Sequence, residues 1–306
     1  MKKLFFLVLC LSIIFISCKQ KNESDTSGRI NPFLTPDTSK VYNENPKLEE
    51  YRNFVLMLDS SDVNTVSLAL NEFKLKFDSL NPNLADSAFF ILQNYLDTVE
   101  MYQNNKLEND TTEYEVLFTG EKVPESVLHF KDSLMECGFR IQLSDDVPYI
   151  VLERKYFIEQ LKNRLSEPMK QYLFHVDIEF LTGFSDVDKI IIKPAEFIDR
   201  IIWYEKFMTE NPDFVFLAQC EKYYKAYLTY LISGFETTQV FKDKNNLTLT
   251  EFYNKAYTYL FKKYNDSNTT LEIKPLYDAI LQKNRINYNE IRKQLIIKGK
   301  IFDLNS

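Results

Sequence analysis

The chain has 306 residues, of which 45% are hydrophobic and 15% aromatic, and its formal net charge is −7. This length and apolar content can supply the core of one or two domains. Lysine and arginine do not cluster, and because binding to phosphates needs a basic patch, nucleic acid is disfavoured as a partner. With only six glycines, the chain is poorly suited to turn-rich sandwiches and barrels, so the composition favours helices.

The first eighteen residues have the pattern of a secretion signal. Lys2 and Lys3 precede an apolar run from Leu4 to Ile16, and only Ser12 interrupts it. The run is shorter than the roughly 20 residues that a membrane-spanning helix needs. A charged start, a short apolar middle and a small residue at the cut site are the parts of a signal peptide. We therefore expect residues 1–17 to be removed as a signal peptide.

The end of this signal, Phe15-Ile16-Ser17-Cys18, resembles the lipobox of bacterial lipoproteins, with Phe15 in place of the usual leucine. The resemblance covers the first 18 residues, and it implies cleavage before Cys18 and acylation of its thiol and new amino terminus. An ordinary signal peptide with an incidental cysteine is the alternative. Because each buried CH₂ contributes about 0.8 kcal/mol, and two or more acyl chains anchor stably, a lipidated Cys18 would hold the protein on a membrane.

A polar stretch follows the lipobox. Lys19 to Gly28 is nearly free of apolar residues and cannot form a core, so we expect residues 18–42 to be the lipidated cysteine and a flexible tether. The stretch is loosely similar to the surface-export signal of lipoproteins of the Bacteroidota. By the sorting habit of enterobacterial lipoproteins, Lys19 beside the lipidated cysteine disfavours retention in the inner membrane. The expected location is the outer membrane of the cell envelope, facing either the periplasm or the surface.

Residues 43–306 are predicted to form a mainly α domain, an irregular stack of antiparallel helical hairpins with a sub-boundary near 104–153. Asn45-Pro46 supplies a helix cap and a first-turn proline. Apolar residues recur at helical spacing in segments 48–58, 63–77 and 85–102, and turns separate the segments. Because these connections are short, the first three helices should pack as antiparallel neighbours.

The period changes after a polar loop predicted at 104–112. Tyr114–Phe118 has the composition of a strand, and a short helix is predicted over 124–135. Residues 139–143 alternate apolar and polar, turn residues follow at 144–146, and 149–152 form the expected return strand. The sequence therefore predicts a small β-hairpin or short sheet around 114–152, inserted into the helical domain.

The remaining chain again has helical spacing. Extended backbone is expected at 190–192 before Pro194, and a polar loop is expected at 242–246. Asn287 and Glu290 provide a capping-box-like start for the last helix. No family resemblance extends to these elements. Helices are predicted over 157–165, 166–183, 194–211, 213–233, 250–264, 271–282 and 287–297.

Catalytic and metal-binding patterns are weak. His175 and Glu179 would share one helix face, but a helical zinc pair usually has two histidines, so a structural role is favoured over a metal site. His129 with Asp132 and Glu125 is a similarly weak pattern. The chain has no nucleophile elbow, phosphate loop or dinucleotide fingerprint. We therefore expect no catalytic residues, metal or cofactor. The alternative is a hydrolase with carboxylates that spacing alone does not reveal.

Two cysteines remain once Cys10 leaves with the signal and Cys18 takes the lipid. Cys137 and Cys220 could form a disulfide in an oxidising envelope. Cys220 lies on an apolar helical face with Phe216, which favours a buried free thiol.

The most unusual local composition is aromatic. Tyr223, Tyr227 and Tyr230, together with the single tryptophan, Trp203, are the candidate ligand-binding residues, because exposed rings stack on glycans or peptides. Their helical spacing favours core packing instead, with hydroxyl groups that reach a partner. The leading hypothesis is a lipid-anchored binding or scaffolding protein with an envelope protein or glycan as its partner. A surface protein that captures glycans or peptides through these rings is an alternative.

Overall fold

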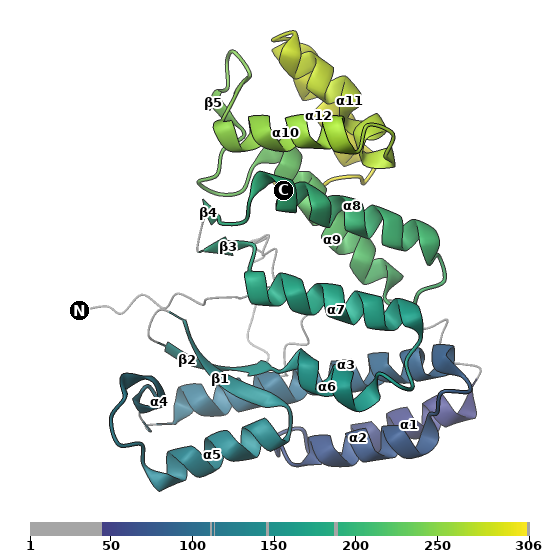
Figure 1. Cartoon of the computed structure of the whole chain (residues 1–306), viewed down its shortest axis with the longest axis vertical. Coiled ribbons are helices and arrows are strands. Elements are labelled where there is room, and N and C mark those ends of the chain that lie inside the picture. Colours follow the sequence, from purple (N-terminus) through teal and green to yellow (C-terminus); the bar gives the residue numbers. More distant parts are fainter. Residues whose placement is uncertain (1–44, 111, 113, 145–146, 187–188, 305–306) are drawn as a thin grey trace, which may run out of the picture. The chain divides into compact units, whose positions relative to one another are not determined.

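The structure is a computed structural model, which describes residues 45–110, 112, 114–144, 147–186 and 189–304. The predicted signal peptide, Cys18 and the tether lie outside the described residues. The described chain divides into two compact units, the N-terminal unit (45–177) and the C-terminal unit (178–304). Within the described ranges the fold is mainly helical, as the sequence predicts, and each sheet is a two-stranded antiparallel hairpin (Figure 1).

Three helices that pack against one another begin the N-terminal unit: α1 (Pro46–Leu56), α2 (Thr65–Lys76) and α3 (Pro82–Asn109). The predicted cap is confirmed, since the Asn45 side chain accepts a hydrogen bond from the Lys47 N–H at 3.0 Å. In the core, the Tyr51 ring packs edge-on against the rings of Phe73 and Phe77, with centroid distances of 5.9 and 5.4 Å. The helix α3 is longer than its apolar pattern indicates, and it includes residues 104–109 of the predicted loop.

The predicted hairpin at 139–152 is confirmed as β1 (Phe139–Ser144) and β2 (Val147–Leu152), with Ile141 opposite Ile150. The predicted strand at 114–118 is wrong. The segment forms a one-turn helix, α4 (Val116–Thr119), which ends at Gly120 with a φ of 78°. A strand needs a free sheet edge, whereas β1 lies against α5 (Glu125–Glu136) and β2 lies against α3. Two further helices, α6 (Arg154–Leu161) and α7 (Glu167–Thr182), complete the unit, and α7 continues across the unit boundary.

Side chains of α3 bond the outer edge of β2. The Asn104 side chain accepts the Ile150 N–H and donates to the Ile150 carbonyl oxygen, both at 2.8 Å. One turn earlier, Glu100 Oε2 accepts the Leu152 N–H at 3.0 Å. An amide and a carboxylate thus take the place of a third strand, because they satisfy backbone groups that an edge strand would otherwise leave open.

The C-terminal unit is built around α8 (Pro194–Glu210), which packs against α9 (Leu217–Ser233), α10 (Glu251–Lys263) and α11 (Asn268–Leu281). The last helix, α12 (Arg285–Ile297), packs against α11. The predicted extended stretch at 190–192 begins in β4 (Lys189–Ile190), which pairs with β3 (Ser185–Asp186).

Two details of this unit differ from the sequence-based prediction. Residues 242–246 are not a simple loop, because Phe241–Asp243 (β5) pairs with Thr248–Leu249 (β6), and the Phe241 ring packs on Tyr288 at 5.3 Å. The capping box at Asn287 and Glu290 is also wrong. The cap is Asn284, whose side chain accepts the Asn287 N–H at 3.1 Å, so the helix starts earlier.

Tyrosine hydroxyl groups bond the buried end of α9. Three of them donate to consecutive carbonyl oxygens: Tyr253 to Tyr230 at 2.9 Å, Tyr257 to Leu231 at 3.0 Å, and Tyr288 to Ile232 at 2.8 Å. The last four carbonyls of a helix have no helical donor beyond them. The Tyr230 carbonyl oxygen also accepts the Gly234 N–H at 3.0 Å, so Tyr257 and Tyr288 supply the donors that this helix end lacks and Tyr253 adds a second bond. These bonds explain part of the tyrosine content of the chain.

Candidate functional site

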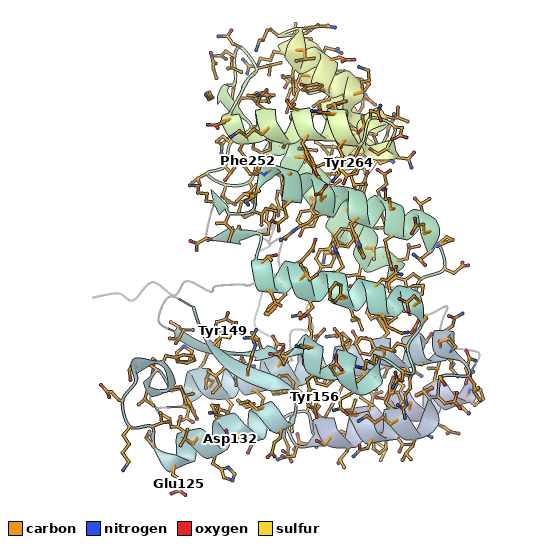
Figure 2. The ribbon with its side chains drawn as sticks, viewed as in Figure 1. Glu125, Asp132, Tyr149, Tyr156, Phe252 and Tyr264 are labelled. Carbon is orange, nitrogen blue, oxygen red and sulfur yellow. The ribbon has the colours of Figure 1, made fainter. Side chains whose placement is uncertain are left out.

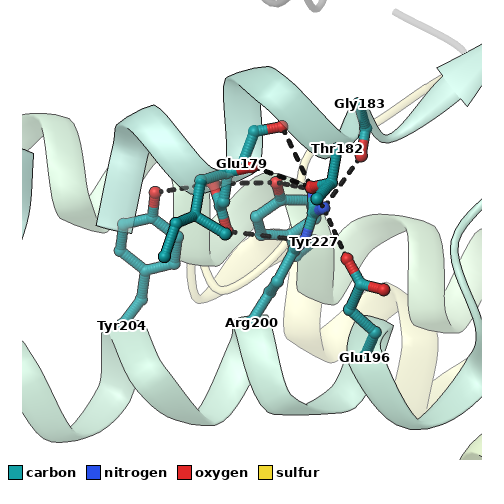
Figure 3. Close-up of polar contacts among 8 residues, drawn as sticks. Glu179, Thr182, Gly183, Glu196, Arg200, Tyr204 and Tyr227 are labelled. Atoms are coloured by element: carbon teal, nitrogen blue, oxygen red, sulfur yellow. Dashed lines mark hydrogen bonds and ion pairs between the residues drawn. The ribbon is translucent and has the colours of Figure 1, made fainter. Parts of the chain in front are cut away.

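The most buried charged cluster of the C-terminal unit surrounds Arg200 (Figure 3). Glu196, Arg200 and Tyr204 follow one another at helical spacing on α8, while Glu179 and Thr182 come from the end of α7. Arg200 Nη2 donates to Glu196 Oε1, to Thr182 Oγ1 and to the Gly183 carbonyl oxygen, at 2.7–2.8 Å. The guanidinium group thus joins the end of α7 to one face of α8.

The Glu179 carboxylate completes this cluster. Its Oε2 accepts hydrogen bonds from the hydroxyl groups of Tyr204 at 3.0 Å and Tyr227 at 3.1 Å, and its Oε1 lies 3.8 Å from Arg200 Nε. Glu179 is 3% exposed and Arg200 4%. Burial opposes the charge of Arg200, but its neighbours Tyr227 and Glu179 hold the pKa of Arg200 above its ordinary value. Burial and the charge of Glu179 raise the pKa of Tyr227.

These contacts give the cluster a structural role. The Arg200 and Glu179 side chains bond other groups of the protein. The loss of one partner of such a buried pair strongly destabilises the fold. The sequence pattern relates Glu179 to His175 and does not indicate Arg200. The available signal was the spacing of Glu196, Arg200 and Tyr204, which places a charge on the apolar face that Phe197 and Ile201 mark.

The four predicted ligand-binding aromatics lie in or near the core. Tyr227 and Tyr230 are buried, and Trp203 and Tyr223 are half-buried. Trp203 stacks on Phe207 with ring centroids 4.8 Å apart, and Tyr223 packs on Tyr204 at 5.6 Å. None of the four lines the cavity at His129 or the cavity between α11 and α12. A capture surface needs open rings, so ligand binding at these positions stays a prediction, and the packing agrees with the core role that their spacing favours.

The histidine patterns separate in the structure. Glu125 and Asp132 lie exposed on α5 (Figure 2), and Asp132 pairs with Lys131 at 3.6 Å. His129, on the same helix, lines a polar cavity of about 380 Å³ in the N-terminal unit. Glu179 is held by the tyrosines named above, and the described residues contain no group of three or more His, Cys, Asp or Glu side chains that could hold a metal ion.

Among the described residues, Cys137 and Cys220 are buried free thiols. Burial raises the pKa of Cys137 and of Cys220, so neither thiol is activated as a nucleophile by its surroundings. The free-thiol interpretation of Cys220 is therefore confirmed.

A larger cavity, of about 750 Å³, lies between α11 and α12 in the C-terminal unit. Its apolar lining comes from Leu271 and Pro275 on α11 and from Ile291 and Leu295 on α12. Leu295 is buried and forms the floor, whereas Leu271 is 60% exposed. We call this cavity the α11–α12 groove. Its polar rim consists of Asn268, Glu272, Glu290, Gln294, Lys298 and Lys300.

The two carboxylates on the rim are engaged by neighbours. Glu272 Oε1 lies 3.0 Å from Lys300 Nζ, and Glu290 Oε1 accepts a hydrogen bond from Gln294 Nε2 at 2.9 Å. A glycosidase pair requires two carboxyl groups that face one substrate bond. Here each carboxylate faces its own partner, so the groove has the chemistry of a binding surface: an apolar floor and a rim of mixed charge and amides.

No helix among the described residues combines the length and the apolar character that crossing a membrane requires. No family model, curated protein or solved structure matches this chain, so the chemistry of its sites rests on its own residues.

Proposed function

We propose that the protein is a lipid-anchored envelope protein that binds an extended segment of a partner protein in the α11–α12 groove. The observation that carries the proposal is the combination of an open apolar floor with a proline inside α11, at Pro275. Apolar surface rimmed by polar residues marks interaction sites on soluble domains. Burial of apolar surface contributes about 25 cal/mol per Å², and Leu271 offers the most exposed aliphatic side chain of the lining.

Pro275 favours an extended partner. A proline has no N–H group, so the Leu271 carbonyl oxygen lacks the donor that residue i+4 of a helix normally supplies. Leu271 and Pro275 both line the groove, which places this acceptor at the edge of the apolar floor. An extended segment has N–H groups free to donate there, whereas an internal turn of a helix has used its own.

The rim favours the same partner. Lys298 and Lys300 follow the end of α12, and Glu290 lies in its first half, so the rim has cations at one end and a carboxylate further along. A segment with two aliphatic residues and an acidic residue toward Lys298 would match both floor and rim.

Selection of peptides on the purified full chain in detergent tests the groove. We expect peptides selected from a random library to carry aliphatic residues at alternate positions, and Leu271→Asp to weaken their binding at least about tenfold. Leu281→Asp is the matched control, because Leu281 lies on the same helix, is also 60% exposed, and does not line the groove. In a selected peptide, methylation of one backbone nitrogen should abolish binding. Equal affinities for the two variants would refute the groove.

The lipid anchor has its own test. The support for it is the lipobox-like end of the signal at Cys18. Metabolic labelling with a fatty-acid probe should label the native chain, and Cys18→Ser should remove both the label and the membrane association. Cys10→Ser is the control, because it makes the same change upstream of the lipobox and should leave the label in place. Label that persists in the Cys18→Ser variant would contradict the anchor.

A further inference from the structure

The polar cavity of the N-terminal unit, about 380 Å³ in volume, is independent of the α11–α12 groove. Three segments build it: the turn before α2, the second half of α3, and α5. Its volume lies within the range of about 300–1,000 Å³ that small-molecule pockets occupy. We call this cavity the α3–α5 cleft.

Gln103 is a fixed acceptor in the cleft. It is only 2% exposed, and its Nε2 donates to the Ser61 carbonyl oxygen at 2.8 Å, which sets the orientation of the amide. The amide oxygen, Oε1, takes no part in this bond and can accept a hydrogen bond from a ligand. A buried amide held in this way is organised before any ligand arrives, so binding loses little side-chain freedom at this position.

Asp62 and Asn64 are organised as well. Asp62 Oδ1 accepts the Asn64 N–H at 3.0 Å and the Asn64 side-chain N–H at 2.9 Å. These bonds fix both side chains in the turn and leave Asp62 Oδ2 and Asn64 Oδ1 as further acceptors. With the serine hydroxyl groups and the His129 imidazole, the lining holds both donors and acceptors.

The charge of the cleft is balanced. Its lining has one carboxylate, Asp62, and one ammonium group, Lys106. Anion sites gather positive charge or backbone N–H groups, and here Asp62 would repel an anion. The lining therefore favours a neutral ligand that both donates and accepts hydrogen bonds.

Phe130 adds an apolar wall. Its half-buried ring packs on Tyr114 with centroids 5.3 Å apart, and Lys106 Nζ lies 5.9 Å from its centroid. An aromatic face suits the C–H face of a sugar ring, whose hydroxyl groups would meet the surrounding amides and carboxylate. From these observations together we infer that the α3–α5 cleft binds a neutral pyranose, either free or as the terminal unit of a glycan.

Titration of the full chain in detergent with methyl glycosides of glucose, galactose, mannose and N-acetylglucosamine tests this site, with saturation-transfer NMR as the readout. At least one glycoside should bind through its ring protons, and the free sugar and a glycan ending in it show which form binds better. His129→Ala should weaken binding about tenfold, because it removes a hydrogen-bonding group from the lining. His129 is exposed, so its loss leaves the fold intact. Phe130→Leu should weaken it similarly.

Asn105→Ala is the matched control, since Asn105 is an exposed neighbour on α3 outside the lining, and it should leave the affinity unchanged. Inorganic phosphate is the competing probe. Binding of phosphate in place of every glycoside, absence of glycoside binding, or an unchanged affinity in His129→Ala would each overturn the inference.

Discussion

Different side chains satisfy the backbone groups at the edge of β2 in the N-terminal unit and at the end of α9 in the C-terminal unit. In the N-terminal unit, carboxylates and amides of α3 do so: Glu100 and Asn104 bond β2, and Asp86 accepts the Ser166 N–H at the start of α7 at 3.0 Å. In the C-terminal unit, tyrosine phenols bond the end of α9, and Arg200 neutralises Glu179. In both units these side chains form hydrogen bonds with backbone groups, but the two sets of side chains respond differently to pH.

The difference lies in which groups titrate near neutrality. Burial, together with the charge of Asp97, raises the pKa of Glu100 to about 7, which is close to neutrality. Burial raises the pKa of Asp86 above its ordinary value. Burial also raises the pKa of Tyr253 and Tyr257 above their ordinary value of 10, so the phenols stay protonated at neutral pH. We therefore expect the stability of the N-terminal unit to change with pH around neutrality. The stability of the C-terminal unit should depend on the Arg200–Glu179 ion pair.

The largest loss of stability should come from breaking the Arg200–Glu179 ion pair. Arg200→Met leaves the Glu179 carboxylate buried without its cation, and it should lower the free energy of unfolding of the C-terminal unit by about 3–5 kcal/mol. Hydrogen exchange in urea, followed on peptides of α8 and α9, measures the loss. Adding Glu179→Gln should restore part of it.

Lys255→Met is the control for Arg200→Met. Lys255 pairs with Glu251 at 2.6 Å on the surface of α10, with both side chains more than half exposed, so its loss should cost no more than about 0.5 kcal/mol. Equal losses in the two variants would show that the buried pair does not stabilise the C-terminal unit.

A second test removes the contribution of Glu100 to the pH dependence of the N-terminal unit. Because the pKa of Glu100 is higher in the folded chain, the stability linked to it is present below about pH 4.5 and is lost as the pH rises toward about 7. The full rise corresponds to about 3 kcal/mol, and we expect about 2 kcal/mol because solvent reaches this half-buried side chain. Glu100→Gln keeps an acceptor for Leu152 and should abolish that loss.

Urea unfolding of the N-terminal unit across this pH range measures the difference between the native chain and Glu100→Gln. The two should agree near pH 4 and diverge as the pH rises, while peptides of the C-terminal unit show no such change. A constant difference at every pH would assign the effect of the variant to packing instead of titration.

The sequence predicts the elements that depend on residues close together in the chain. It misses the contacts between residues far apart in the chain. Helical spacing locates the helices, and alternation at 139–143 locates the hairpin, because both patterns depend on neighbours within a few residues. The strand expected at 114–118 fails because a strand needs an edge, and Asn104 and Glu100 already bond the edge of β2. Local composition does not show that the edge is taken.

The candidate sites depend on distant residues as well. His129 was considered with its neighbours on α5, whereas the structure places it in one lining with Asp62 and Gln103. The helical spacing of Tyr227 and Tyr230 favours core packing, and both are buried, but this spacing does not show that the Tyr227 hydroxyl donates to Glu179 on another helix. The Arg200 cluster likewise joins residues of α7, α8 and α9, and no spacing rule relates them.

The smallest effect should come from a single phenol. Tyr257→Phe keeps the ring in the core and removes the donor to the Leu231 carbonyl oxygen, so the buried acceptor is left without that bond. We expect a loss of about 1 kcal/mol in the stability of the C-terminal unit, independent of pH below about 9. Tyr277→Phe is the control, because its ring stacks on Tyr257 at 5.1 Å and its hydroxyl makes no hydrogen bond within the described ranges. If both variants were equally stable, the phenols would contribute packing alone, and the contrast between the two units would rest on the Arg200–Glu179 pair.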